Sequence, residues 1–268
     1  MIRTANLIKE RQVIKICFSY SDKEAFRKIA SFPDVKMKSD YWEGYITQKL
    51  IELLKELNFV FSPSLQNWDK KEDEVKKLSL NLNVEELYKY QIEGVHFLEQ
   101  KNGRALIADE MGLGKTVQVL SWLKLHPEFS KVLVICPASL KINWQREAEK
   151  WALLDMEILN GTTPHKIKSN DVIINYDILS YWEKHLKLKQ FDVIIFDEAH
   201  YIKNNKAKRT KAFKRLVKSV PRLIALTGTP IENKPIEIYN IVKVIDPSIF
   251  PDATDFAIEF CGAKKTRF

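Results

Sequence analysis

The segment ALIADEMGLGKT, residues 105–116, runs from a short apolar stretch into a glycine-rich turn, and a helical pattern follows it. A strand, a turn and a helix in this order form the phosphate loop G-x-x-x-x-G-K-[ST]. Asp109 stands where that pattern has its first glycine, so the match is partial. The segment therefore predicts either a phosphate-binding loop or a glycine-bearing turn that binds no ligand.

The second half of the segment retains the residues that would bind phosphate. Gly112 and Gly114 let backbone N–H groups approach phosphate oxygens at the positive end of the following helix. We expect Lys115 to reach the β- and γ-phosphates of ATP and the hydroxyl of Thr116 to ligate Mg²⁺.

From Leu82 onward, short apolar runs alternate with longer helical stretches, which is typical of an α/β fold with a mostly parallel sheet. Each run is almost continuously apolar, as expected for strands that helices cover on both faces. The expected strands are Ala105–Ala108, Val132–Cys136, Val172–Asn175, Val193–Phe196 and Leu223–Leu226.

The segment FDVIIFDEAH, residues 191–200, ends an apolar strand in two adjacent carboxylates. Successive side chains point in different directions as a strand ends, so one carboxylate can face a metal and the other a water. We expect Asp197 to bind Mg²⁺ and Glu198 to act as the water-polarising base, with a simple helix cap as the alternative. Asp197 follows Lys115 by 82 positions (197 − 115). In a parallel sheet, both strand ends open on the carboxyl edge, where ligands bind.

The residues before this domain predict a small α+β module. Ile14–Tyr20 alternates like a strand, and Asp40–Ile46 has the aromatic content of a second one. Helices are expected after Ser21 or Asp22, either of which suits an N-cap, and over Gln48–Leu57. A dense charge run then suggests a linker. The predicted division is an accessory module at 1–66, a charged linker at 67–81 and the α/β domain at 82–268.

Composition points to a soluble protein in a reducing compartment. No run of about eighteen uncharged apolar residues occurs, and no leader with a cleavage site is recognisable at the N-terminus. Cys17, Cys136 and Cys261 are far apart and offer no spacing for a disulfide framework or a zinc cluster. We expect an intracellular location without a membrane partner, in the cytoplasm or nucleoid, or in the nucleus of a eukaryote.

The formal net charge of +8 is concentrated in Tyr201–Ser219, which holds eight Lys or Arg and no Asp or Glu; 43 − 8 leaves 35 basic residues against 35 acidic ones elsewhere. On a helix from about Lys206, basic and apolar residues separate into two stripes. The basic stripe is Lys208, Lys211, Arg215 and Lys218, and the apolar stripe is Ala212, Phe213, Leu216, Val217 and Val220. The basic stripe is either a DNA contact or a solvated face.

Nearly all of Leu82–Phe268 resembles the first RecA-like lobe of the Swi/Snf-like ATPases of helicase superfamily two. The motifs stand in the family's order: LYKYQIEGVHFL (87–98), ADEMGLGKT (108–116), CPASLKINWQREAEKW (136–151), DEAH (197–200) and LTGTPIEN (226–233). The family's own phosphate loop includes the aspartate, so Asp109 agrees with the resemblance.

The resemblance implies a role for each motif. Gln91 would read the edge of adenine, with Tyr88 or Tyr90 near the ring, while Ser139 and Lys141 lie in a segment similar to one that touches the DNA backbone. Residues 226–233 would couple hydrolysis to lobe movement. The implied phosphate-loop contacts are Met111, Gly112, Leu113, Gly114, Lys115 and Thr116.

Phe32–Ile46 resembles the HARP module that precedes the motor in annealing helicases, and the C-terminal residues resemble the same subgroup. This implies a preference for branched or junction DNA, with Tyr41, Trp42 and Tyr45 available to stack on unpaired bases. The alternative is an unrelated accessory fold with an aromatic core.

The expected function is the nucleotide-binding lobe of a double-stranded-DNA-stimulated ATPase and translocase that remodels or reanneals DNA, using ATP and Mg²⁺. The family's second RecA-like lobe, which supplies an arginine to the γ-phosphate, is not recognisable after Asn233. We therefore expect the isolated chain to hydrolyse ATP slowly, with a second lobe as a partner. The alternatives are a DEAH-type RNA helicase and a non-catalytic DNA-binding module.

Overall fold

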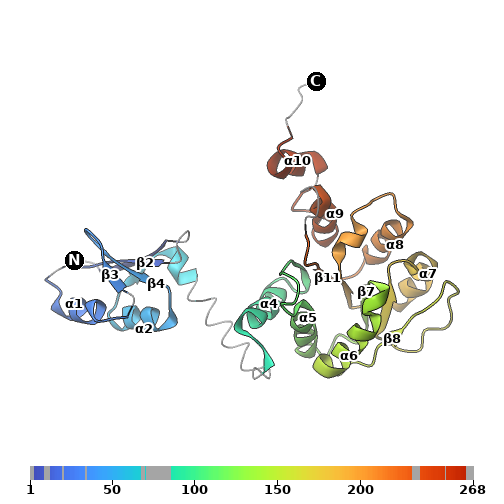
Figure 1. The fold of residues 1–268 in the computed structure, drawn as a ribbon, viewed down its shortest axis with the longest axis horizontal. Helices are drawn as coiled ribbons and strands as arrows, with labels where there is room; N and C mark the ends of the chain where they lie inside the picture. Colours follow the sequence, from blue (N-terminus) through green and yellow to red (C-terminus); the bar gives the residue numbers. More distant parts are fainter. Residues whose placement is uncertain are drawn as a thin grey trace. The chain divides into compact units, whose positions relative to one another are not determined.

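The computed structural model describes residues 3–8, 13–19, 21–33, 35–67, 70, 86–230, 236–250 and 252–263. The chain divides into two compact units, Met1–Lys77 and Leu78–Phe268 (Figure 1). Each unit has its own sheet and its own hydrophobic core. Among the described residues, none of the helices has the length and apolar character needed to cross a bilayer.

The first unit is a five-stranded sheet of order β3-β4-β2-β1-β5, with the helices α1 and α2 and a further helical stretch at residues 63–67. Its pairs are antiparallel except β1 with β5, which run parallel. The elements are β1 (Thr4–Ile8), β2 (Val13–Cys17), α1 (Lys23–Ala30), β3 (Val35–Met37), β4 (Trp42–Tyr45), α2 (Gln48–Glu56) and β5 (Val60–Phe61).

Helices α1 and α2 begin where the sequence offers a side-chain cap. Asp22 accepts a hydrogen bond from Ala25 N at the start of α1, and Thr47 accepts one from Leu50 N at the start of α2. The apolar sides of α1 and α2 pack on the sheet to form the core of the unit. Strands β1, β3 and β5 are short and lack clear alternation, so they were not predictable from the sequence.

The second unit is built on a six-stranded parallel sheet of order β6-β11-β10-β7-β9-β8. Its strands are β6 (Arg104–Ile107), β7 (Val132–Cys136), β8 (Glu157–Ile158), β9 (Val172–Asn175), β10 (Val193–Phe196) and β11 (Arg222–Leu226). Its helices are α4 (Lys89–Gln100), α5 (Lys115–Lys124), η3 (Ala138–Leu140), α6 (Lys141–Ala152), α7 (Leu179–Lys189), η4 (Ala199–Ile202), α8 (Lys208–Val217), α9 (Ile236–Ile245) and α10 (Ala253–Cys261). The predicted central strands are therefore confirmed, with ends shifted by a residue at β6 and β11.

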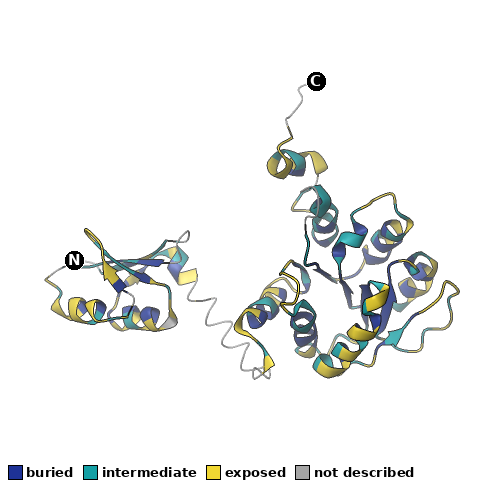
Figure 2. Cartoon of the chain, in the orientation of Figure 1, coloured by how far each residue is buried: buried dark blue, intermediate teal, exposed yellow. Residues whose placement is uncertain are grey.

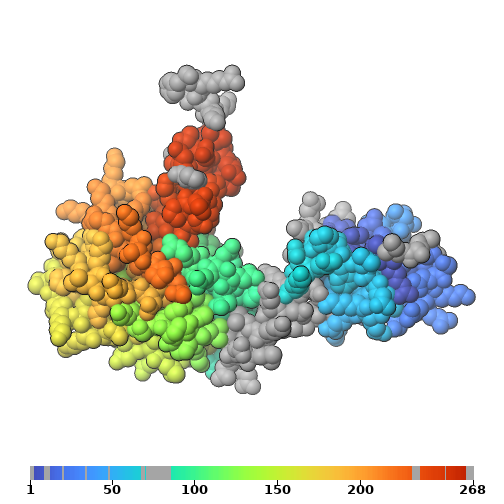
Figure 3. Space-filling model, turned by 180° about the vertical axis from the view of Figure 1, so that it is seen from behind, coloured from blue at the N-terminus to red at the C-terminus, as the bar shows by residue number. Residues whose placement is uncertain are grey.

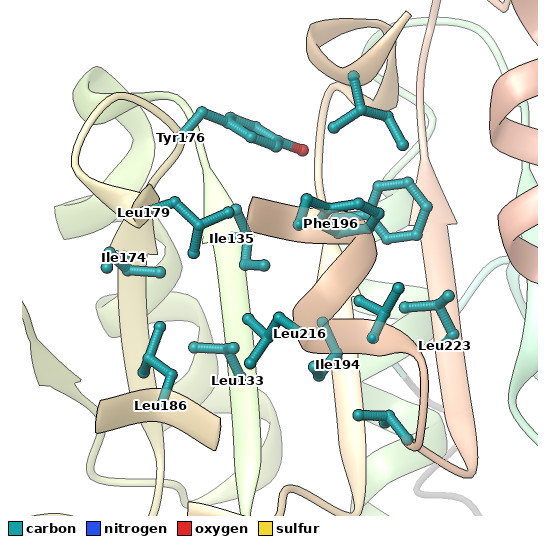
Figure 4. Packing of buried hydrophobic residues seen from close by; sticks show 14 of the residues in the cluster. Leu133, Ile135, Ile174, Tyr176, Leu179, Leu186, Ile194, Phe196, Leu216 and Leu223 are labelled. Carbon is teal, nitrogen blue, oxygen red and sulfur yellow. The ribbon is translucent and has the colours of Figure 1, made fainter. Parts of the chain in front are cut away.

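Helices cover both faces of this sheet, so its middle strands are buried on both sides (Figure 2). Alternate residues of β10 belong to different cores: Ile194 and Phe196 pack with α7, α8 and α9, whereas Val193 and Ile195 pack with α4, α5 and α6. Figure 4 shows the first of these cores, in which Ile194 and Phe196 lie beside neighbours from other strands and helices. The next residue after Phe196 therefore faces the side of α5 and α6.

Helix α9 contacts β6, β11 and η4. Helix α10 packs against α9 through the rings of Tyr239 and Phe256; it stands away from the strands in Figure 1 and projects from the surface of the second unit in Figure 3.

Candidate active site

The phosphate loop follows β6 and ends in the first turn of α5. Gly112 and Gly114 have φ of +83° and +73°, a left-handed conformation that glycine adopts at low cost. Gly114 is the N-cap of α5, so the first N–H groups of that helix face the turn. Lys115 Nζ donates to the carbonyl oxygens of Asp109 (2.9 Å) and Glu110 (3.0 Å). Lys115 thus lies over its own loop, at the N-terminus of α5. A helix N-terminus suits the binding of phosphate.

Gln91 joins this loop to the start of α4. Its Oε1 accepts a hydrogen bond from Tyr88 N (3.0 Å), and its Nε2 donates to Leu113 O (3.3 Å). Gln91 is buried, while the rings of Tyr88 and Tyr90 are exposed and stack on each other with centroids 5.7 Å apart. Both ends of the Gln91 amide are therefore engaged by protein atoms, and the exposed aromatic surface beside the loop comes from the two tyrosines.

Asp197 follows β10 and is held by three neighbouring segments. Its N–H donates to Ile135 O (2.8 Å), and its carbonyl accepts from the Tyr176 hydroxyl (2.6 Å). Its Oδ2 accepts from Trp144 Nε1 (2.9 Å), and its Oδ1 accepts from Glu198 N (2.8 Å). The sequence analysis did not assign roles to Trp144 or Tyr176, because contacts across tens of residues leave no local signal.

The electrostatics of Asp197 suit a cation. Burial raises the pKa of this carboxyl, while the Trp144 and Glu198 N–H groups and the charges of Lys115 and His200 act in the opposite direction. A desolvated carboxylate gains free energy from a nearby positive charge. Cys136, on the same side of the sheet, stays a thiol because burial, together with the charge of Asp197, raises its pKa to about 12.

Glu198 has φ of +49° and is the N-cap of η4. This conformation turns the chain sharply after Asp197, so the two carboxylates point in different directions. His200 Nδ1 lies 3.3 Å from Glu198 Oε2. The arrangement leaves Glu198, half-buried, as a second carboxylate at the carboxyl edge.

Gly228, just beyond β11, approaches the phosphate loop closely. A Cβ added there would lie 2.6 Å from Met111 Cγ and 3.5 Å from Lys115 Nζ. The segment LTGTP (226–230) therefore borders the loop, whereas residues 231–233 of the same motif lie outside the described residues. The importance of this glycine could be anticipated only from the family motif.

The residues at this edge fit a nucleotide with Mg²⁺. A lysine and the N-terminus of a helix suit phosphate, and nothing would lie within 4 Å of a Cβ at Gly112, so the loop is open there. Asp197 supplies a carboxylate in a site that disfavours an uncompensated negative charge. Thr116 follows Lys115 in the first turn of α5 and is half-buried.

The two residues expected to touch the DNA backbone differ in exposure. Ser139 lies in η3 and is exposed. Lys141 is buried, and its Nζ donates to Leu159 O (3.1 Å), Asn160 Oδ1 (2.5 Å) and Asn175 Oδ1 (3.2 Å). Its expected DNA contact needs correction, because an ammonium group has three donors and here all three are engaged inside the protein.

Helix α8 separates basic and apolar residues as predicted, although it begins at Lys208 rather than near Lys206. Ala212, Phe213, Leu216, Val217 and Val220 are buried. Lys208, Lys211 and Lys218 are exposed, whereas Arg215 donates to both oxygens of Glu183 on α7, at 2.8 and 2.6 Å. Arg215 is exposed as well, but its guanidinium is ion-paired with Glu183, and the other basic residues of the exposed stripe are the three lysines.

A parallel sheet with a phosphate loop after one strand and an acidic pair after another, both at the carboxyl edge, defines a RecA-like nucleotide-binding lobe. Residues 90–264 match the family model of the SNF2-related domain, and the chain belongs to that family. The Swi/Snf-like resemblance and the fold class are thereby confirmed.

One relative is the Caenorhabditis elegans homolog of SWI/SNF-related matrix-associated actin-dependent regulator of chromatin subfamily A-like protein 1. It is 36% identical over 191 residues, and the match covers 69% of this chain and 28% of the relative. The human DNA annealing helicase and endonuclease ZRANB3 is 34% identical over 187 residues, 66% of this chain and 17% of the relative. The chain thus spans less than a third of either protein.

A solved structure described as the Sulfolobus solfataricus SWI2/SNF2 ATPase core in complex with dsDNA has a similar fold. Its TM-score is 0.55 at 33% identity, covering 65% of this chain and 38% of that one.

Proposed function

We propose that this chain is the nucleotide-binding lobe of a double-stranded-DNA-stimulated ATPase that translocates on DNA and remodels or reanneals it. One observation carries the proposal. The phosphate loop and Asp197 both lie at the carboxyl edge of the parallel sheet, on the side that α5 and α6 cover. The name of the human relative, an annealing helicase, and the duplex DNA in the similar solved structure favour DNA as the partner.

In this proposal, Lys115 and the N–H groups of residues 111–116 bind the phosphates. Lys115 Nζ exchanges its hydrogen bonds to Asp109 O and Glu110 O for phosphate oxygens. Thr116 and Asp197 hold Mg²⁺, which neutralises charge on the phosphates. Glu198 accepts the proton of the attacking water.

The base of the nucleotide would lie beside Tyr88 and Tyr90, whose stacked rings are exposed next to the loop. Gln91 would contribute by fixing Leu113 of the loop relative to these rings. The second N–H and the second oxygen lone pair of the Gln91 amide, which these two hydrogen bonds do not use, would read the adenine edge. A second RecA-like lobe and an intracellular location, nucleoid or nuclear, belong to the same proposal.

The proposal is tested by nucleotide binding and single-turnover hydrolysis with the chain. We expect a fluorescent ATP analogue to bind in the presence of Mg²⁺, with hydrolysis slow and faster with duplex DNA than with structured RNA. Providing an arginine in trans is worth about 10³- to 10⁵-fold in related phosphoryl-transfer enzymes, so a chain that turned over at the rate of a complete motor would contradict the role of a second lobe.

Two substitutions separate binding from chemistry. Glu198→Gln should retain nucleotide and lose hydrolysis, because the amide preserves shape but accepts no proton. Lys115→Ala should weaken nucleotide binding about 10- to 100-fold, the loss expected for hydrogen bonds to a charged group. Lys124→Ala, at the exposed end of the same helix, is the matched control. Equal affinities for Lys115→Ala and the parent would remove Lys115 from the phosphate site.

A further inference from the structure

A buried hydrogen bond links α6 to Asp197, the candidate metal ligand. Trp144 is 1% exposed, and its Nε1 donates to Asp197 Oδ2 at 2.9 Å. The two residues are 53 positions apart. They meet because Asp197 continues the side of β10 that faces α5 and α6, and because Trp144 lies on the buried side of α6. This bond fixes Oδ2, and the Glu198 N–H donates to Oδ1, so each carboxylate oxygen keeps a further lone pair for a metal.

The first turn of α6 is anchored separately. Lys141, three residues before Trp144, donates to Asn175 Oδ1 at the end of β9 and to Leu159 O after β8. These bonds fix α6 to the carboxyl edge of the sheet. Because Trp144 lies about one turn further along the same helix, a movement of the first turn of α6 against these bonds would also move Trp144.

The chain just before α6 is at the surface. The η3 turn, Ala138–Leu140, follows β7 at the carboxyl edge, and Ala138 and Ser139 are exposed. Ser139, with its exposed hydroxyl, thus precedes by five positions (144 − 139) the tryptophan that donates to Asp197. The same helix connects the candidate DNA contact to the candidate metal site.

We propose that Trp144 is a positioning residue that orients Asp197 and makes the affinity for the metal nucleotide depend on DNA bound at η3. The inference rests on the proposed function, because it requires both a metal nucleotide and DNA. DNA contacts at Ser139 shift the first turn of α6, and Trp144 transmits the shift to Asp197. By linkage, the metal nucleotide changes the affinity for DNA by the same factor.

The test uses Trp144→Phe, which removes the indole N–H and keeps a ring in the core. Trp151→Phe is a matched control, since Trp151 Nε1 on the same helix donates to Glu147 Oε2 at the same distance, 2.9 Å, but away from Asp197. Mn²⁺ replaces Mg²⁺ as the probe, and its binding in the presence of ADP is followed by electron paramagnetic resonance, with and without a short duplex.

We expect Trp144→Phe to weaken Mn²⁺ binding about 10- to 100-fold, as for other groups that orient metal ligands, and to remove the effect of DNA on it. Affinity for metal-free ADP should stay at the parental value, as should every property of Trp151→Phe. Parental Mn²⁺ affinity in Trp144→Phe would overturn the positioning role, and a retained DNA effect would overturn the coupling. A parent chain that binds no metal nucleotide would instead contradict the proposed function.

A second measurement is made on the parent chain and needs the Trp144→Phe and Trp151→Phe variants only to assign resonances. In the parent chain labelled with ¹⁵N-tryptophan, the indole N–H resonance of Trp144 should shift when Mg²⁺ and ADP bind and again when duplex is added. The Trp151 resonance, assigned from its loss in Trp151→Phe, should not shift. A Trp144 resonance that is insensitive to DNA would overturn the coupling.

Discussion

At the scale of single residues, Gly114 has two separate reasons to be glycine. Its φ of +73° disfavours any side chain, and a Cβ there would lie 2.4 Å from Gln91 Nε2. Gly161 has nearly the same φ, +72°, but nothing lies within 4 Å of an added Cβ. The two glycines therefore allow backbone strain to be separated from displacement of Gln91.

We predict that Gly161→Ala lowers the free energy of unfolding by about 1–2 kcal/mol, the cost of the left-handed conformation. Gly114→Ala should cost more, because Gln91 must also leave its hydrogen bonds to Tyr88 N and Leu113 O. It should also weaken nucleotide binding, while Gly161→Ala should not. Chemical denaturation and nucleotide titration of both variants give the comparison, and equal losses of stability would mean that the contact with Gln91 has no energetic weight.

The candidate site residues could be predicted from the sequence where a single short motif contains them. The phosphate loop and the acidic pair are local patterns, so their positions at two strand ends could be anticipated from Lys115, Asp197 and the strands before them. The orientations of Lys141 and Arg215 could not, because their partners, Asn175 and Glu183, lie 34 and 32 positions away. A basic residue in a surface-like pattern gives no indication of a carboxylate or amide beneath it.

At the scale of elements, α8 presents a basic stripe of Lys208, Lys211 and Lys218 on a helix whose other side is in the core. If these lysines contact phosphates, log affinity for duplex DNA should fall with log salt by about 0.9 for each contact. Replacing the three with Gln should then reduce the salt slope by roughly 2.7 and leave nucleotide affinity unchanged. Arg215→Gln should mainly reduce stability, because Glu183 loses its partner.

The matched control for this set replaces Lys124, Lys184 and Lys187, which are exposed on α5 and α7, with Gln. It removes the same charge from other helices. If both triple variants reduce the slope equally, net charge and not the stripe accounts for DNA binding, and α8 is a solvated face.

A second element-level feature is the link between α4 and α5. Glu99 Oε2 accepts from Trp122 Nε1 (2.9 Å) and lies 2.7 Å from His126 Nε2. Burial alone would raise the pKa of Glu99, but the hydrogen bonds from His126 and Trp122 outweigh it and hold the pKa below its ordinary value of 4.5. The charged carboxylate is therefore favoured in the folded state.

The sign of the pH dependence follows from this shift. A depressed carboxyl pKa contributes stability above the unfolded pKa, and this contribution is lost as pH falls from 4.5 through the lower folded value. The melting temperature of Glu99→Gln should thus lie below the parent's at neutral pH and converge with it in acid. Glu149→Gln, an exposed carboxylate on α6, should show a difference that does not depend on pH in this way. A constant gap between Glu99→Gln and the parent would contradict the assignment.

At the scale of the whole molecule, the sequence predicted the second unit better than the first. Buried parallel strands are continuous apolar runs, such as VLVIC and VIIF, and these have few other readings. In the first unit, β3 and β5 are short. Strand β5 pairs parallel with β1, although most of the unit's sequence lies between the two strands. Such pairing depends on tertiary contacts and leaves little periodicity in a short segment.

The first unit also divides its aromatic residues between two sides of its sheet. Trp42 lies on the core side, stacked on Phe18 with centroids 6.5 Å apart and edge-on to Phe26 at 5.8 Å. Tyr45, on the other side of β4, is 64% exposed, and Lys15 Nζ lies 4.3 Å from the ring centroid of Tyr41. Of the three residues expected to stack on bases, Trp42 is therefore a packing residue.

The final prediction concerns the contribution of the first unit to the choice of DNA structure, which its HARP resemblance implies. Deleting residues 1–66 should reduce the preference for forked over linear duplex DNA. It should leave nucleotide affinity unchanged, because the nucleotide site described above is built from residues of the second unit.

Within the full chain, Tyr45→Ala should weaken fork binding by about 1–3 kcal/mol if the ring stacks on an unpaired base. Val60→Ala, at another exposed apolar residue of this unit, should not. Trp42→Ala should lower the stability of the unit instead, so thermal unfolding distinguishes it from a binding variant. An unchanged fork preference in both the deletion and Tyr45→Ala would assign junction recognition to the second unit or to the rest of a larger assembly.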